Sequence, residues 1–150
     1  MVGLINAGID QIRRLARGLD PVEIEAIGLS SALNQLAEDT RALFRIACVF
    51  RCPQTVPRLD PTISRQLYCI AQEAIHNALA HGRAKNIEIK LTFTDGQTAL
   101  LIADDGSGFL EEAVRTGMGL RIMKYRARSI GGILRIDSQV NRGTRITCQV

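Results

Sequence analysis

Apolar positions in the first third of the chain recur at helical spacing. They fall every three or four residues between positions 4 and 19, and the same spacing returns between positions 28 and 44. Gly18 and Pro21 predict the end of the first helix, since glycine and proline both stop helices. The segment 45–52 is rich in strand formers, and the prolines that follow it predict a loop.

The middle of the chain predicts one long helix followed by a hairpin. Asp60 and Pro61 form a helix-start signal, because a carboxylate caps the first turn and proline fits the first helical position. Apolar residues continue at helical spacing until Gly82, which predicts the end of this helix. Strands are predicted at 86–94 and 98–103, because the Asp-Gly pair between them is a strong hairpin signal.

The last third predicts a glycine-rich loop, a helix and a closing hairpin. The glycine-rich stretch covers residues 104–119, the helix 120–130, and the two strands 133–138 and 144–150. Strand pairs separated by helices favour an α+β fold: a two-layer α/β sandwich whose mixed sheet of about five strands carries three helices on one face. A Rossmann fold is not expected, since strands and helices do not alternate regularly.

Composition narrows the classes of partner. The net charge is +4, but the arginines are scattered and aromatic residues make up only 4% of the chain, which argues against a nucleic-acid partner. No apolar run approaches the roughly 18 residues of a membrane span, and residues 1–9 lack the pattern of a signal peptide. We therefore expect a cytoplasmic domain without membrane contact, whose four cysteines are reduced thiols rather than zinc ligands.

The long helix carries the first candidate for chemistry. Glu73 and Asn77 are four residues apart and share one helix face. A carboxylate and an amide placed in this way can hold a hydrated Mg²⁺ ion and polarise a nucleophile. An ordinary solvated helix face would show the same pair.

The second candidate is Asp104, which directly follows an apolar strand and precedes Gly106 and Gly108. Glycine lets a flat ligand approach the backbone closely. An ionised aspartate only accepts hydrogen bonds, which suits an exocyclic amine such as that of adenine. An acidic turn without a ligand is the alternative.

Two further motifs follow. The segment Gly117, Met118, Gly119, Leu120 leads into a helix, and backbone N–H groups at a helix start can bind phosphate. It is not a Walker A loop, because no Gly-Lys-Ser/Thr follows. Thr144 belongs to an Arg-Gly-Thr segment that could equally be a plain hairpin turn.

Together, these four motifs resemble, in order and spacing, the N, G1 and G2 boxes and the terminal Gly-Thr of the GHKL ATPase superfamily, whose sandwich is called the Bergerat fold. The resemblance covers about residues 43–150. The segments Q-E-A-I-H-N-A-L-A-H, D-D-G-S-G-F and G-M-G-L-R-I-M-K-Y-R-A are similar to sensor histidine kinases of the nitrate-sensor type, and the short lid at 110–116 suits that branch. The resemblance implies a helical dimerisation or linker remnant at 1–28, outside the core, and a catalytic domain at 29–150.

The resemblance also implies roles for individual residues. Glu73 would help to activate the incoming histidine, Asn77 would ligate Mg²⁺, and Asp104 would accept a hydrogen bond from the adenine amine. Glycines would admit the base and cradle the phosphates, and Thr144 would support the adenine through Asp104 or a water. The implied nucleotide-binding residues are Asn77, His81, Asp104, Gly106, Gly108, Gly117, Met118, Gly119, Leu120 and Thr144. His81 could equally be no more than the cap of its helix, and His76 is expected to be only a helix neighbour of Asn77.

The activity implied is transfer of the γ-phosphoryl group of ATP, with Mg²⁺, to a histidine on the dimerisation domain of the same kinase. The parent kinase would be a homodimer, membrane-anchored or not, that serves a cognate response regulator. We expect the chain to bind Mg-ATP without phosphorylating itself, because its two histidines both lie on the ATP-site helix. Ala80 stands where the family commonly has a lysine; Arg83 or Lys85 could substitute for it.

Two other functions remain open at this point. A GHKL serine kinase of the anti-sigma-factor class would share Glu73, Asn77, Asp104 and the glycines. A nucleotide-binding module without catalysis would also fit, given Ala80.

Overall fold

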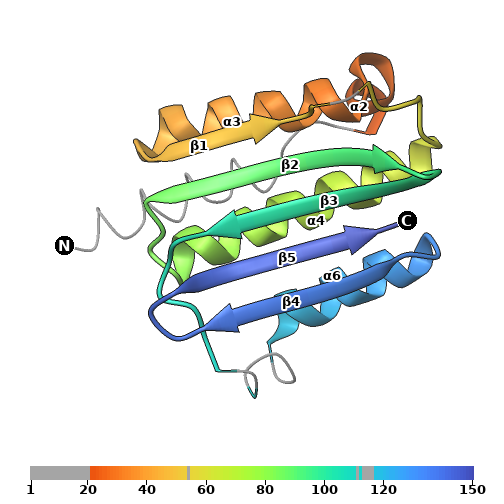
Figure 1. Ribbon diagram of the computed structural model, residues 1–150. Coiled ribbons are helices and arrows are strands. Elements are labelled where there is room, and N and C mark those ends of the chain that lie inside the picture. The colour runs from red at the N-terminus through yellow and green to blue at the C-terminus, as the bar shows by residue number, and fades with distance from the viewer. Residues whose placement is uncertain (1–20, 54, 111, 113–116) are drawn as a thin grey trace.

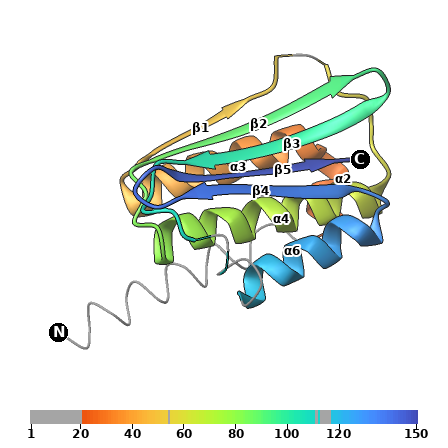
Figure 2. The same cartoon turned by 60° about the horizontal axis from the view of Figure 1, so that its bottom comes forward.

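The computed structural model describes residues 21–53, 55–110, 112 and 117–150, and within them it forms one sheet with helices on one face (Figures 1 and 2). This confirms the predicted α+β sandwich. The helix predicted at 4–19 and most of the lid predicted at 110–116 lie outside the described residues. The elements in chain order are α2 (Pro21–Ile27), α3 (Leu29–Phe44), β1 (Ala47–Arg51), α4 (Pro61–Ala80), β2 (Asn86–Thr94), β3 (Gln97–Asp104), α6 (Met118–Ser129), β4 (Ile133–Gln139) and β5 (Gly143–Gln149).

The sheet is mixed, with the strand order β1-β2-β3-β5-β4. β1 pairs in parallel with β2, whereas the other three pairs are antiparallel. The β3–β5 register sets Asp104 directly opposite Thr144. Two motifs that are forty positions apart in sequence therefore meet at one end of the sheet.

Local signals account for the bounds of the long helix and the first hairpin. The Oδ1 atom of Asp60 accepts a hydrogen bond of 2.8 Å from the backbone N–H of Thr62, and Pro61 opens α4. Asp95 and Gly96 have positive φ angles of 52° and 78°, as the tight turn of a two-residue hairpin requires.

The core lies between the sheet and the helices. Along β2, Ile87, Ile89 and Leu91 are buried while the residues between them are more exposed, which is the alternation of a sheet covered on one side. Figure 2 shows α2, α3, α4 and α6 together on that covered side. Among the described residues, no helix has both the length and the apolar character that crossing a membrane needs.

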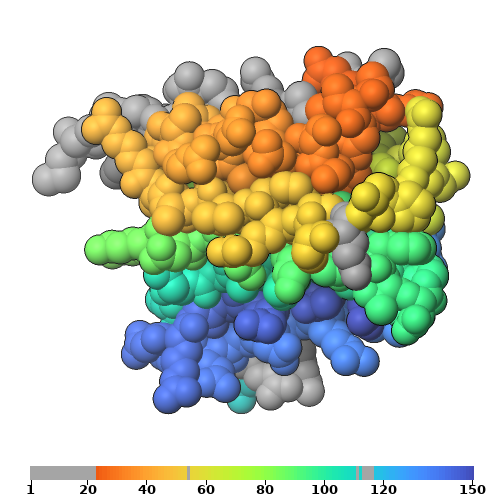
Figure 3. Space-filling view, turned by 45° about the horizontal axis from the view of Figure 1, so that its top comes forward, coloured from red at the N-terminus to blue at the C-terminus, as the bar shows by residue number. Residues whose placement is uncertain are grey.

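α2 corrects two expectations. It spans Pro21–Ile27, where the sequence analysis predicted no helix. Its Ile24 is 2% exposed and belongs to the core, so the expectation that residues before 29 lie outside the core is wrong for α2. Gly28, at φ 83°, separates α2 from α3, and the two form one surface with β1 in Figure 3. α2 is thus a further helix beside the three expected on this face.

Candidate nucleotide-binding site

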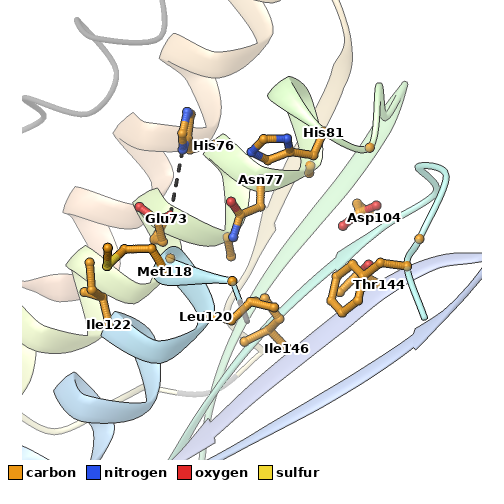
Figure 4. A pocket seen from close by; sticks show the side chains of 17 residues that line it. Glu73, His76, Asn77, His81, Asp104, Met118, Leu120, Ile122, Thr144 and Ile146 are labelled. Atoms are coloured by element: carbon orange, nitrogen blue, oxygen red, sulfur yellow. Dashed lines mark ion pairs between the residues drawn. The ribbon is translucent and has the colours of Figure 1, made fainter. Parts of the chain in front are cut away.

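A cavity of about 600 Å³ opens between α4, the start of α6, the C-terminal end of β3 and the N-terminal end of β5 (Figure 4). This volume falls within the range of small-molecule sites. All but one of the predicted site residues line it: Glu73, Asn77, His81, Asp104, Gly108, Gly117, Met118, Gly119, Leu120 and Thr144. The exception is Gly106, which lines a neighbouring hollow with Gly82 and Ser107.

Asp104 stands at the end of β3 and is partly buried. Burial raises the pKa of its carboxyl group, and the charge of Asp105 acts in the same direction. Backbone hydrogen bonds from Gly106 and Thr144 oppose that shift, the first of them 2.8 Å long. Asp104 is therefore a carboxylate held in place by the backbone, with capacity to accept a further hydrogen bond from a ligand.

Asp105 has a different task from its neighbour. Its carboxylate accepts hydrogen bonds from the backbone N–H groups of Lys85 and Asn86, at 2.9 and 2.8 Å, and from the Asn86 side chain at 2.6 Å. The pKa of Asp105 is lowered chiefly by the Asn86 side-chain hydrogen bond. Asp105 thus ties the segment after α4 to the end of β3. The alternation of side chains along a strand was the signal that could have separated the two aspartates.

Glu73 and Asn77 face the start of α6 from α4, as Figure 4 shows. The Oε1 atom of Glu73 lies 3.8 Å from Nδ1 of His76. The rings of His76 and His81 meet edge to face with their centroids 6.2 Å apart. His76 therefore lines the cavity beside Glu73, which its expected place as a mere helix neighbour did not anticipate.

His81 caps its helix and also lies at the cavity. Its backbone N–H caps α4 by donating to the carbonyl oxygen of Asn77 at 3.1 Å. Its side chain is exposed and also lines the cavity. The position alone does not require a contact with a ligand.

Three glycines make the loop and hairpin around Asp104 fit together. At Gly108 (φ 61°) a Cβ atom would overlap the carbonyl oxygen of Gln139, and at Gly143 (φ 89°) it would overlap that of Asp104. At Gly106 a Cβ atom would lie 2.7 Å from the carbonyl oxygen of Gly82. Close packing is thus sufficient reason for glycine at these positions, and the roles of Gly106 and Gly108 toward a ligand stay predictions.

The residues present fit Mg²⁺ only as an ion shared with a ligand. Within the described part of the chain, no three His, Cys, Asp or Glu side chains are grouped so that they could hold a metal. The side-chain oxygens of Asn77 and Glu73 are hard ligands of the kind that Mg²⁺ takes alongside phosphate oxygens and water.

A helix-covered mixed sheet, with a cavity between an acidic strand end and a glycine-led helix, defines the chain as a GHKL-type ATPase domain. The sequence model described as histidine kinase-, DNA gyrase B- and HSP90-like ATPase matches residues 62–150, and the chain belongs to this family. The resemblance noted in the sequence is thereby confirmed.

Similar proteins include several sensor histidine kinases. The chain is 30% identical over 150 residues to the oxygen sensor histidine kinase NreB of Staphylococcus carnosus, covering 99% of the chain and 43% of that protein. It is also 30% identical over 142 residues to the sensor histidine kinase LiaS of Bacillus subtilis, covering 94% of the chain and 39% of that protein. The chain therefore spans less than half the length of these relatives.

Solved structures support the fold. A histidine kinase domain from the Erythrobacter litoralis EL346 blue-light activated histidine kinase aligns with a TM-score of 0.66 at 20% identity, over 81% of this chain and 64% of that one. The ATP-binding domain of PrrB from Mycobacterium tuberculosis aligns with a TM-score of 0.60 at 22% identity, over 77% of this chain and 87% of that one.

Proposed function

We propose that this chain is the ATP-binding catalytic domain of a two-component sensor histidine kinase, which transfers the γ-phosphoryl group of ATP to a histidine on a dimerisation domain of the same kinase. One observation carries the proposal: a single cavity has Asp104 toward one end and Glu73, Asn77 and the start of α6 toward the other (Figure 4). Residues 29–150 would form the catalytic domain, and 1–28 the exit from the dimerisation region, with α2 docked on the core.

The end of the cavity near Asp104 suits adenine. The carboxylate accepts a hydrogen bond from the exocyclic amine, while Leu120 and Ile146 offer apolar walls to the base. Thr144 contributes its backbone, which helps to hold Asp104, and its hydroxyl lies 2.8 Å from that of Ser138. The support that Thr144 gives to the base is then indirect, through Asp104.

The other end suits the phosphates. The N-cap residue of α6, Gly117, has no side chain to cap the helix, so the first N–H groups of α6 have no side-chain partner from the cap position. Such N–H groups and the helix dipole bind anions. The Asn77 amide oxygen would hold Mg²⁺, which supplies charge neutralisation on the phosphate oxygens when it is bound.

Transfer would then depend mainly on position and electrostatics. The bond between the γ-phosphorus and the bridging oxygen of ADP breaks as a nitrogen–phosphorus bond forms to the acceptor imidazole. Glu73 accepts the proton that the imidazole gives up at its other ring nitrogen. Glu73 is partly exposed at the cavity, which leaves it within reach of a histidine that a second domain presents.

The first test of the proposal is calorimetric titration of Mg-ATP into the folded chain, followed by transfer from ³²P-labelled ATP. The acceptors would be a histidine-bearing dimerisation domain, the same domain with its histidine replaced by alanine, and a serine-bearing anti-anti-sigma protein. Acid-labile label on the first acceptor alone is expected. Label on the serine protein would instead indicate the anti-sigma-factor class. Binding without any transfer would indicate a nucleotide-binding module, the reading that Ala80 favours.

The same proposal gives the parent kinase a homodimeric form and a cognate response regulator as its indirect partner. The response-regulator partnership is tested by transfer from the phosphorylated dimerisation domain to a receiver domain. A receiver domain whose acceptor aspartate is substituted is the control.

A further inference from the structure

Gly119, the second residue of α6, lies directly against Glu73 of α4. A Cβ atom at Gly119 would overlap Oε1 of Glu73, and it would lie 3.1 Å from Cδ of Glu73 and 3.5 Å from Nδ2 of Asn77. Gly119 lies in a regular helix and does not have a positive φ angle, so alanine can adopt its backbone conformation. The position therefore needs glycine for the space it leaves and not for its backbone conformation.

The arrangement is set by how the two helices pack. α4 and α6 are in contact and run in opposite directions. Two contacts show this direction: Arg126 donates a hydrogen bond of 2.9 Å to Gln66, and Gly119 lies against Glu73. His76 lies on the other side of the carboxylate, 3.8 Å from its Oε1 atom. The Glu73 carboxylate thus lies between an imidazole and the main chain of α6, although its side chain remains 30% exposed.

We propose that Gly119 is a positioning residue for Glu73. Because Gly119 has no side chain, the Glu73 carboxylate can occupy the space beside α6 at the point where a histidine is presented. The inference rests on the proposed function and assigns Gly119 a role different from cradling phosphate. If Gly119 binds phosphate, its substitution should change the affinity for ATP. If Gly119 positions Glu73, its substitution should change the transfer step, and only through Glu73.

Gly119→Ala separates these two roles. The atom in the way is the end of a flexible side chain, and alanine favours the helix, so the carboxylate moves and α6 stays. We expect the variant to fold with an unchanged or slightly higher Tm and to bind Mg-ATP within about threefold of the wild type. Transfer to the histidine domain at saturating ATP should fall by about 10- to 100-fold, since misplacing a catalytic group by about 1 Å has effects of this size.

The matched control is the same substitution without the carboxylate. Glu73→Ala lowers transfer by itself, and Gly119→Ala added to it should change transfer by less than twofold. An equal loss in both backgrounds would mean that Gly119 acts without Glu73, and the inference would be overturned. A loss of ATP affinity that parallels the loss of transfer would overturn it too, in favour of the phosphate cradle.

A crystal structure of the Gly119→Ala chain supplies a readout that needs no transfer. The expected result is a Glu73 carboxylate displaced from His76 with the backbone of α6 in place. A carboxylate that keeps its position, with α6 moved instead, would overturn the inference. If the wild-type chain transfers phosphate to no acceptor, the proposed function is wrong. The position of the Glu73 carboxylate in the variant's crystal structure still decides whether Gly119 positions it.

Discussion

Asp104→Asn is expected to weaken ATP binding and at the same time to reverse the preference for the base. The substitution keeps the shape of the side chain but replaces one acceptor oxygen by an NH₂ donor. The remaining oxygen can still accept the hydrogen bond from the Gly106 backbone, which is 2.8 Å long in the native chain. The NH₂ group then meets the exocyclic amine of adenine, and two donors cannot pair.

The size of the effect follows from the lost hydrogen bond. A hydrogen bond to a charged group contributes about 1.5–3 kcal/mol, which corresponds to about 10- to 150-fold in affinity. Asp104 is only partly buried, so solvent screens the interaction and favours the lower part of this range. We therefore expect Kd for Mg-ATP to rise by about 10- to 50-fold.

Inosine triphosphate makes the assay two-sided, because it carries a carbonyl where ATP carries the amine. The native carboxylate repels that carbonyl, whereas the asparagine NH₂ donates to it. Calorimetry should show the native chain preferring ATP and the variant losing or inverting that preference. Affinities for both nucleotides that stay within twofold of the native values would refute the contact between Asp104 and the base.

The pH dependence supplies a further check on the same residue. Because burial raises the pKa of Asp104, protonation should weaken ATP binding at a higher pH than for an ordinary aspartate. The folding stability of the chain without nucleotide depends on pH in the opposite direction. Because the pKa of Asp104 is raised, this group contributes stability at acid pH that is lost as the pH rises through that pKa. The asparagine variant corrects for titration of the nucleotide itself.

Three other substitutions or treatments test the fold around the site. Gly143→Ala should lower the free energy of unfolding by about 1–3 kcal/mol, and by more than Gly96→Ala, since both have positive φ but only the first would overlap the Asp104 carbonyl; equal losses in urea unfolding would contradict the packing. Asp60→Ala should cost about 1 kcal/mol by removing the cap of α4, and Asp60→Asn, which keeps an acceptor, should cost less in the same assay. Burial raises the pKa of Cys48 and Cys148 to about 11. A thiol reagent at pH 8 should therefore modify the partly exposed Cys52 and Cys69 first, and all four cysteines only in denaturant. Early labelling of Cys48, detected by peptide mapping, would contradict its burial.

Much of the fold could be predicted because its signals are local. β2 and β3 are joined by an Asp-Gly turn, and α4 starts at Asp60 and Pro61, so neighbouring residues alone define these bounds. The parallel pairing of β1 with β2 was not predictable in this way, because the whole of α4 separates the two strands. Among the side chains of α2 that the structure describes, Ile24 is the buried one, and a single residue carries little pattern.

The candidate site divides along the same line. The motifs themselves were readable, since carboxylates and glycines at strand ends and helix starts are typical of ligand sites. Their geometry was not: the closeness of Glu73 to Gly119 depends on how two helices pack. Sequence spacing says nothing about the distance between residues 73 and 119.

These tertiary distances tie the site to the completeness of the fold. Asp104 takes its backbone support from Thr144 only when β5 pairs with β3, and Glu73 meets Gly119 only when α6 packs on α4. A loosened C-terminal hairpin would therefore remove support from the base end of the cavity while leaving Glu73 in place. A ligand that spans both ends favours the fully paired state and stabilises it by mass action. Substitutions in the hairpin, such as Gly143→Ala, should for this reason weaken binding through Asp104 without touching the catalytic end.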